Sequence, residues 1–276
     1  MKILVTGARG RVARSVVMQL LEAGQEVRAA GRDPGTVSLP AGVQVVGADL
    51  ARPETLGPAL TGVSKVFLYA AHDGVAGFVA EAREASVEHI VLLSAQGASA
   101  GSEDRIARMH GVAERDVAGS EIAWTFLRPG AFATNTLQWA ASIRAEGVVR
   151  DPFPDAQVAA VHEADIAAVA VRALLDPGHQ GAAHVLTGPQ SVTQREQVEL
   201  IGAAIGRRVE FAELDVEDYR RTLARWGPPE VADALVRHMV EAVESPALVT
   251  DAVQDVTGRP ARSFAEWAAD HAADFA

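Results

Sequence analysis

The segment KILVTGARGRVARSVVMQLLEAGQEVRAAGRDP, which begins at Lys2, constrains the fold of this chain more than any other. An apolar run meets Gly7 and Gly10, an amphipathic stretch follows, and a second apolar run ends at Gly31. A strand, a glycine turn and a helix in this order form an anion site, because the first helical N–H groups point outward. Ala13 stands where a third glycine is common, which helix–strand packing tolerates. The segment predicts a dinucleotide-binding βαβ unit; the alternative is a plain strand–helix turn.

The end of the second strand indicates which dinucleotide binds. NAD sites usually place a carboxylate there for the ribose 2′-hydroxyl, whereas NADP sites place a cation for the 2′-phosphate. This chain has no acid at the strand end, and Arg32 follows Gly31 directly. A guanidinium fork suits a phosphate, and Arg9 or Arg11 could add a second charge. We therefore predict NADP(H) as the cofactor. The alternative for Arg32 is a solvated surface arginine, and Asp33 is expected to form a turn.

Short apolar runs alternate with helical patterns through the first half of the chain. Strands of this kind, separated by helices, are typical of a parallel sheet that is covered on both faces. The pattern predicts an α/β fold with a doubly wound parallel sheet of the Rossmann type. We expect strands at about 2–6, 26–30, 43–47, 65–70, 89–93 and 122–127, and helices at 11–23, 75–86 and 104–118.

The rhythm changes after Pro129 and Gly130. Residues 131–276 are predicted to form a smaller, mostly helical substrate-binding cap, partly interleaved with an NADP-binding core at 1–130. Thr193 is a plausible helix N-cap, with Glu196 at capping-box spacing. In this half we expect strands near 157–161 and 182–188 and helices at 135–144, 163–176, 193–206, 215–226, 229–244 and 263–274.

Composition excludes several functions. The net charge of −11 argues against nucleic acid as a partner. The chain has no run of about 18 apolar residues, so no membrane span is predicted, and its N-terminus lacks a secretory pattern. We therefore expect a cytoplasmic protein that does not bind membranes. Cysteine is absent and the eight histidines lack ligand spacing, so no metal site is predicted. A monomer or homodimer is expected.

Several motifs together resemble a known family. Their order and spacing are similar to those of the atypical short-chain dehydrogenase/reductases, specifically the NmrA-like NAD(P)-binding group, over essentially the whole chain. The matching motifs are LVTGARGRVA at 4–13, VRAAGRDP at 27–34, GADL at 47–50, IVLLSA at 90–95, HGVAE at 110–114, AWTFLRPGAFATN at 123–135 and DVTGRPARSFAEWAADH at 255–271.

The resemblance implies a set of cofactor contacts. Asp49 and Leu50 would flank the adenine, the strand ends would line the ribose and nicotinamide, and the backbone after Pro129 would meet the carboxamide. Asp49 could instead be an ordinary N-cap or turn residue, and Ser94 could satisfy a strand-end carbonyl. The implied cofactor-binding residues are Thr6, Gly7, Arg9, Gly10, Arg11, Val12, Arg32, Asp49, Leu50, Tyr69, Ala70, Ala71, Ser94, Pro129 and Gly130.

The tyrosine–lysine pair of many short-chain reductases is missing. In those enzymes a tyrosine donates the proton and a lysine four residues later lowers its pKa. Lysine occurs here only at Lys2 and Lys65, and tyrosine only at Tyr69 and Tyr219. Lys65 and Tyr69 have the spacing in reverse order on one strand. Hydride transfer stays possible, because the cofactor carries that chemistry.

Other side chains could replace the tyrosine. His110 is the first candidate, because imidazole exchanges protons near neutral pH. Glu114 lies one helical turn on, and the pair could instead only orient the helix. Ser94 and Gln96 could bind a substrate oxygen, and the His-Asp pair at 72–73 could be catalytic or a turn. A phenolic substrate, which has its own ionisable hydroxyl, would need no protein acid.

Large side chains of the second half could line a substrate pocket, although such residues often form ordinary core. The leading prediction is an NADPH-dependent reductase that acts on an aromatic or cyclic ketone, quinone or enone. Such a substrate could be a polyketide or another secondary metabolite, or a compound that is detoxified. A non-catalytic NADP(H) sensor of NmrA type is the alternative, and an isomerase or epimerase is a third. The candidate substrate-binding residues are Phe132, Trp139, Tyr219 and Trp226, with Met239 nearby in sequence.

Overall fold

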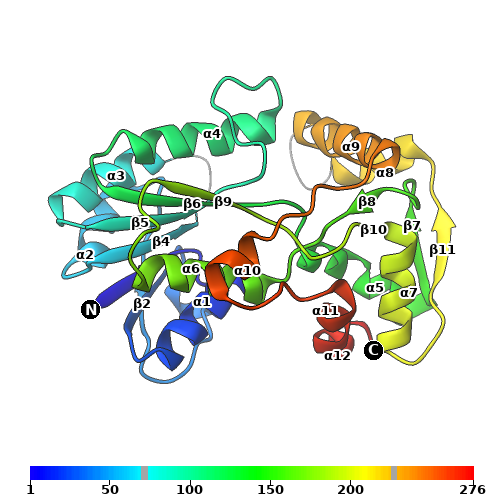
Figure 1. Cartoon of the computed structure of the whole chain (residues 1–276), viewed down its shortest axis with the longest axis horizontal. Coiled ribbons are helices and arrows are strands. Elements are labelled where there is room, and N and C mark those ends of the chain that lie inside the picture. Colours follow the sequence, from blue (N-terminus) through cyan, green and yellow to red (C-terminus); the bar gives the residue numbers. More distant parts are fainter. Residues whose placement is uncertain (70–73, 225–228) are drawn as a thin grey trace.

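Seven strands form one parallel sheet in the order β3-β2-β1-β4-β5-β6-β9 (Figure 1). The computed structural model describes residues 1–69, 74–224 and 229–276. The order reverses between β1 and β4, as in a doubly wound fold, so the predicted fold class is confirmed. The strands are β1 (Lys2–Val5), β2 (Glu26–Gly31), β3 (Gln44–Gly47), β4 (Lys65–Tyr69), β5 (His89–Leu93), β6 (Ala123–Pro129) and β9 (Ala182–Leu186).

Helices cover both faces of this sheet, and each layer buries an apolar core against it. Strand β5 is buried along its whole length, which explains its continuous apolar sequence. One face carries α1 (Arg11–Glu22), α6 (Glu163–Leu175) and α10 (Ala252–Thr257). The other carries α2 (Leu56–Leu60), α3 (Val75–Glu84) and α4 (Arg105–Ala118), and the short 3₁₀ helices η1 (Pro34–Thr36) and η2 (Pro53–Thr55) lie in loops.

The sheet extends beyond the predicted core. Strand β9 pairs in parallel with β6, and α6 packs against α1, with Gln19 donating to the Ala164 carbonyl at 3.0 Å. We expected six strands in the sheet and placed β9 and α6 in the second half. The division at residue 130 therefore does not coincide with the end of the sheet. A short strand pattern does not specify which sheet it joins.

The remaining elements form a second, largely helical part beside the sheet (Figure 1). Two small sheets pair β10 with β8 and β11 with β7, and of these four strands only β8 was expected from the sequence. The expected capping box at Thr193 and Glu196 is present. The elements are η3 (Ala133–Trp139), α5 (Ala140–Glu146), β7 (Val148–Asp151), β8 (Gln157–Val158), β10 (Val192–Thr193), α7 (Gln194–Ala204), β11 (Glu210–Glu213), α8 (Val216–Leu223), α9 (Pro229–Glu244), α11 (Phe264–Asp270) and α12 (Ala272–Phe275).

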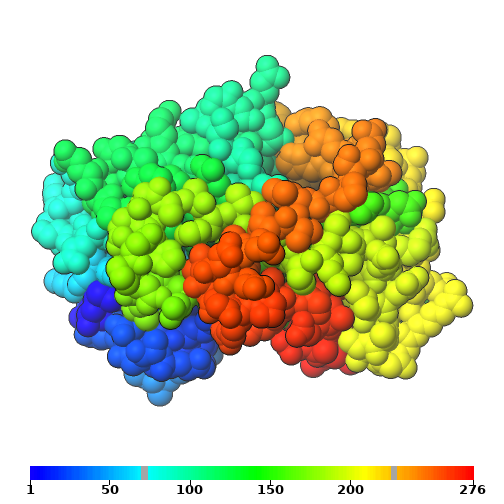
Figure 2. Space-filling view, viewed as in Figure 1, coloured from blue at the N-terminus to red at the C-terminus, as the bar shows by residue number. Residues whose placement is uncertain are grey.

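The C-terminal helices lie across the junction of the two parts. Figure 2 shows this segment, in orange and red, running over the front face between the sheet and the cap. Helix α10 packs on α6 of the sheet layer, whereas α11 packs on α7 of the cap. Within the described ranges, no helix combines the length and apolar character that a membrane crossing requires, and no cluster of acidic and histidine side chains is arranged to hold a metal ion.

Candidate functional site

A cleft of about 760 Å³ opens at the carboxyl ends of β1, β2 and β4. This is the point where the strand order reverses, and open α/β sheets bind ligands at such points. The cleft gathers most of the predicted cofactor residues in one place. They are Thr6, Gly7, Arg9, Gly10, Arg11, Val12, Arg32, Asp49, Leu50 and Tyr69.

The glycine turn between β1 and α1 has little room for side chains, and we call its backbone the glycine cradle. Gly7 has φ +69°, and a Cβ there would lie 2.9 Å from the Cβ of Tyr69. A Cβ on Gly10 would lie 3.2 Å from the Gly7 carbonyl oxygen. A side chain at either position would crowd neighbouring protein atoms, so the turn requires glycine, and its bare backbone borders the cleft in which a pyrophosphate would bind.

The N-terminus of α1 lacks a protein cap. Gly10 is its N-cap residue, no side chain of the described residues accepts a hydrogen bond from the first turn, and that turn holds no acid. Helices α4, α6, α7, α8 and α11 all have a side-chain acceptor at this position. The free N–H groups of α1 and its dipole thus form an anion site that faces the cleft.

Two arginines of the cleft are free to bind an anion. The guanidinium groups of Arg9 and Arg32 make no hydrogen bond or ion pair with any described residue, and both side chains are exposed. Arg11 instead lies 3.4 Å from Asp274. Asp33 forms the expected turn, accepting from the Gly35 N–H at 3.2 Å. A glycine cradle, an uncapped helix and unpaired guanidiniums together fit a dinucleotide that carries an additional phosphate.

Asp49 has a structural role and also lines the cleft. Its carboxylate accepts from the Ala51 N–H at 3.1 Å and pairs with Arg52 at 3.3 Å. Leu50 lies beside it in the cleft wall. Both readings of Asp49, a turn residue and a neighbour of the adenine, are compatible with this position.

A largely buried ionic cluster lies at the carboxyl ends of β5 and β6. Ser94 donates to Glu114 at 2.6 Å, and Arg128 binds the same carboxylate through two contacts of 2.8 and 2.6 Å. The hydrogen bond with Glu114 raises the pKa of Arg128. We had considered Glu114 only as a neighbour of His110. Ser94 is 2% exposed and does not line the cleft, so its hydroxyl proton is committed to Glu114.

The other strand-end candidates lie close together. The Gln96 N–H donates to the Pro129 carbonyl at 2.8 Å, and the Gln96 side-chain oxygen lies 2.7 Å from where a Gly130 Cβ would stand. None of these three residues lines the cleft. His110 lies half-buried on α4, one turn before Glu114.

The predicted substrate residues separate into different environments. Phe132 lines the cleft. Trp139 is 6% exposed and belongs to the apolar core of the cap. Tyr219 packs edge-on against Phe153 in a second apolar cluster, where burial and then the nearby Asp151 carboxylate raise its pKa. Predicted residues that lie outside the described part of the chain are Ala70, Ala71, His72, Asp73 and Trp226.

Some cleft residues were not anticipated. Thr134 and Asn135 border the cleft on the side of Phe132, and they end the motif AWTFLRPGAFATN quoted above. Small residues at the ends of β2 and β3 leave room for a ring system, and their size was the available signal. These are Ala30, Gly31 and Ala48.

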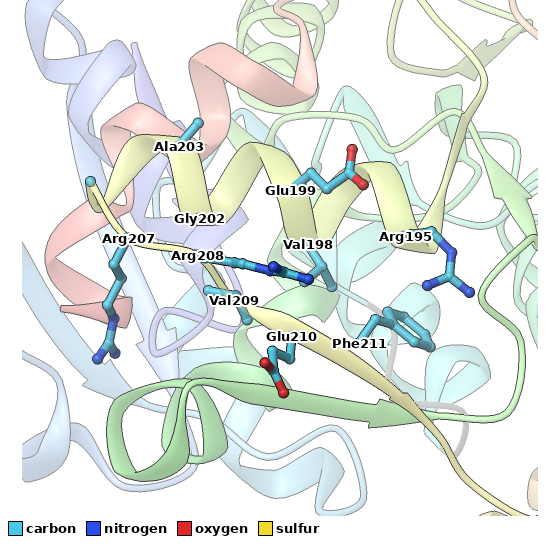
Figure 3. A pocket seen from close by; sticks show the side chains of 11 residues that line it. Arg195, Val198, Glu199, Gly202, Ala203, Arg207, Arg208, Val209, Glu210 and Phe211 are labelled. Atoms are coloured by element: carbon cyan, nitrogen blue, oxygen red, sulfur yellow. The ribbon is translucent and has the colours of Figure 1, made fainter.

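A second hollow, of about 700 Å³, lies in the cap between α7 and β11 (Figure 3). Arg195 stacks on Phe211 at 5.2 Å and lies 3.5 Å from Glu213. Arg207 donates to the Ile143 carbonyl at 2.7 Å. Two glutamates, Glu199 and Glu210, share the lining of this hollow with its arginines, as Figure 3 shows, and the helix beside it is capped. Its lining therefore has two acids against three arginines, where the lining of the cleft has one acid against three.

Comparisons with known proteins support the interpretation of the cleft as a dinucleotide-binding site. A family model described as NAD(P)H-binding matches residues 7–177. The chain is 41% identical to (4-alkanoyl-5-oxo-2,5-dihydrofuran-3-yl)methyl phosphate reductase of Streptomyces griseus, over 99% of both chains. It is 39% identical to NAD(P)H azoreductase of Xenophilus azovorans, again over 99% of both. The structure of an NADPH-dependent quinone oxidoreductase from Escherichia coli superposes with a TM-score of 0.80 at 27% identity, covering 97% of this chain and 98% of that one.

Proposed function

This chain belongs to the NAD(P)H-binding family and, within it, to the NmrA-like atypical short-chain dehydrogenase/reductases, and from that premise we propose that it is an NADPH-dependent reductase of small cyclic acceptors. The proposed acceptors are quinones, enones and ketones whose reduced form is stabilised by conjugation. When bound, the reduced nicotinamide supplies the hydride.

The observation that carries the proposal is the pair of unpaired arginines in the cleft. Arg9 and Arg32 flank the end of β2, where no acid stands to receive a ribose hydroxyl. Their position supports NADPH over NADH, because a 2′-phosphate gains charge-assisted hydrogen bonds that a hydroxyl cannot make. The glycine cradle and the free end of α1 would hold the pyrophosphate that both cofactors share.

The missing tyrosine–lysine pair favours acceptors that need little help from an acid. Lys65 donates to the Leu174 carbonyl, and Tyr219 is enclosed in an apolar cluster. Hydride addition to a quinone or enone leaves a delocalised anion that is more stable than an isolated alkoxide, so it can form without an acid and take its proton from solvent afterwards. The names of two relatives support this choice, since one acts on an unsaturated dihydrofuranone and the other is an azoreductase.

A protein acid would come from a short list. Ser94 donates its proton to Glu114, so it can offer only lone pairs to a substrate. Imidazole side chains exchange protons near neutral pH, and His110 lies on α4 one turn before Glu114, near the strand end that carries Gln96. We therefore assign proton donation to His110 and orientation of the acceptor to Gln96 and Phe132.

Turnover tests the proposal. NADPH oxidation should be followed by absorbance with a panel of butenolides, quinones, cyclic ketones and azo compounds, across a range of pH. A reductase oxidises NADPH with at least one of them, and His110→Ala should lower that rate by about 10²- to 10⁴-fold with cofactor affinity intact. A protein that binds NADPH tightly and reduces none of the panel would instead fit the sensor function that we kept as the alternative.

A further inference from the structure

A row of four ionisable side chains connects the glycine turn with the cap. Arg11 Nη2 lies 3.4 Å from Asp274 Oδ1, and Asp274 Oδ2 lies 2.8 Å from His271 Nδ1. His271 Nε2 lies 2.8 Å from Glu163 Oε1. His271 therefore places one ring nitrogen against each of two carboxylates, and basic and acidic side chains alternate along the row. The row joins α1, α12, α11 and α6 across the junction that Figure 2 shows from the front.

Asp274 is held in place from the cap side, independently of Arg11. Arg144 of α5 donates to its backbone carbonyl, and His271 binds its carboxylate. The His271 hydrogen bond lowers the pKa of Asp274, which is therefore ionised at neutral pH. His271 itself stacks on Trp267, with ring centroids 4.5 Å apart. A carboxylate fixed in this way keeps its position when Arg11 moves.

Glu163 anchors the other end of the row. Burial alone would raise its pKa, but hydrogen bonding with His162 lowers it to about 2. Its second oxygen accepts from Trp267 Nε1 at 3.0 Å. The anchored carboxylate holds His271 on the Asp274 side, so the cap presents one fixed negative charge to the phosphate-binding turn.

Arg11 belongs to the cleft, whereas Asp274 does not line it. Arg11 is the first residue of α1, the helix whose N-terminus has no protein acceptor. In the present structure its guanidinium is neutralised by Asp274, and both side chains are partly exposed, 46% and 38%. A pyrophosphate at the helix N-terminus would carry more charge than one carboxylate and would also receive the free N–H groups.

We infer that Asp274 competes with the pyrophosphate of the cofactor for Arg11 and thereby limits nucleotide affinity. Binding of the dinucleotide frees Asp274 from Arg11, so α12 responds to occupancy of the cleft. Asp274 is a positioning residue, since it acts through Arg11. The inference rests on the nucleotide site alone and not on the proposed acceptor. The pyrophosphate is common to NADPH and NADH, so both cofactors feel the competition equally.

The test is the dissociation constant of each cofactor, measured by calorimetry on Asp274→Asn. This variant should bind NADPH and NADH each about three- to tenfold more tightly, because Arg11 is no longer held by a carboxylate and is available to the pyrophosphate. Asp270→Asn is the matched control. It removes the same charge from the same C-terminal segment, at a side chain that is 64% exposed and pairs with His162, and it should leave both constants within twofold.

A double-mutant cycle separates competition from a structural effect. In an Arg11→Met background, Asp274→Asn should change neither constant by more than twofold, because the contested group is gone. Unchanged or weaker binding by Asp274→Asn overturns the inference, as does the same gain in the Arg11→Met background. Turnover does not enter this test, so the inference can fail while the proposed reductase stands, and the reverse.

The wild-type protein provides a second measurement that no folding defect can confuse. Hydrogen exchange should become slower in residues 7–13 when NADPH is added, because the turn is covered. In residues 272–276 it should become faster by about twofold or more, because Asp274 loses a partner. Unchanged or slower exchange in 272–276, together with protection of 7–13, overturns the inference.

Discussion

The nucleotide cleft and the α7–β11 hollow have similar volumes, about 760 and 700 Å³, and opposite chemistry. Both lie beside a helix and both contain arginines. In the cleft the helix is uncapped and Arg9 and Arg32 have no partner within the described residues. In the hollow a capping box closes the helix, and Arg195 and Arg207 are already bound, which leaves Arg208 as an exposed arginine beside two glutamates of the lining. Polar groups left without a partner, more than volume, identify the binding site.

The largest difference should come from blocking the glycine cradle. Gly10→Val adds a branched side chain whose Cβ would lie only 3.2 Å from the Gly7 oxygen, at a place that a pyrophosphate must approach. Because Gly10 has an ordinary φ of −72°, the fold should survive. NADPH affinity, measured by calorimetry, should fall by about 100-fold or more, since several backbone contacts are lost together.

Ala203→Val is the matched control for this change. It adds the same bulk to an exposed position in the hollow, and it should leave NADPH affinity unaltered. If a folded Gly10→Val protein binds NADPH normally, or if Ala203→Val weakens binding as much, the assignment of the two regions is wrong.

The second difference concerns the unpaired arginines. Arg32→Ala should weaken NADPH by about 10- to 150-fold, equivalent to about 1.5–3 kcal/mol, and leave NADH nearly unchanged. Arg208→Ala removes an exposed arginine of the hollow and should change neither cofactor. Titrations of both variants with both cofactors make the comparison. Equal losses of affinity for NADPH and NADH in Arg32→Ala would show that Arg32 does not bind the 2′-phosphate.

A smaller difference is expected in stability rather than binding. Asp151 ends β7, the strand that pairs with the wall of the hollow, and it is 1% exposed. Burial raises its pKa to about 6 from 3.8. The folded state therefore binds this proton more tightly than the unfolded state, so the wild type gains stability as the pH falls through 6 toward 4.

Asp151→Asn should remove this pH dependence. Its gain in unfolding free energy over the wild type should be larger at pH 7.5 than at pH 5 by about 1–1.5 kcal/mol, as measured by urea denaturation. NADPH affinity should not change. Asp155→Asn, an exposed residue of the following loop, is the control and should show no such difference. A gain of equal size at both pH values would mean that Asp151 titrates as a solvated carboxyl.

The smallest effects are expected from the two tyrosines. Tyr69 borders the cleft, half-exposed over Gly7, while Tyr219 is packed in the cap. Neither has a lysine at the required spacing, so Tyr69→Phe and Tyr219→Phe should each keep turnover within about tenfold, or 1.4 kcal/mol of barrier. The assay is NADPH oxidation with the best acceptor. A thousandfold loss in either variant, with cofactor affinity intact, would identify that phenol as the proton donor.

The cleft could be predicted because its chemistry is local in sequence. Gly7, Gly10 and Arg32 occupy one βαβ unit, and neighbouring residues decide whether a turn forms, whether a helix is capped and which residue ends a strand. The sheet followed from apolar runs that the structure buries on both faces. The predicted elements agree with the observed ones to within a few residues in this half of the chain.

The rest depends on pairs that lie far apart in the chain. The Ser94–Glu114–Arg128 cluster, the β7–β11 pairing and the Arg11–Asp274 contact join residues separated by 14 to 263 positions. No local pattern encodes such a partner, because it is chosen by packing of the whole fold. The sequence for this reason left Trp139 open between a substrate pocket and ordinary core, and the structure places it in the core of the cap.

The most direct test of the account is a pair of titrations on the wild-type protein. NADPH and NADH should be titrated by calorimetry at one salt concentration and one pH, so that only the 2′-phosphate differs. The cleft with its free Arg9 and Arg32 predicts NADPH binding that is tighter by about 10- to 150-fold. Equal affinities for the two cofactors, or tighter binding of NADH, would contradict it.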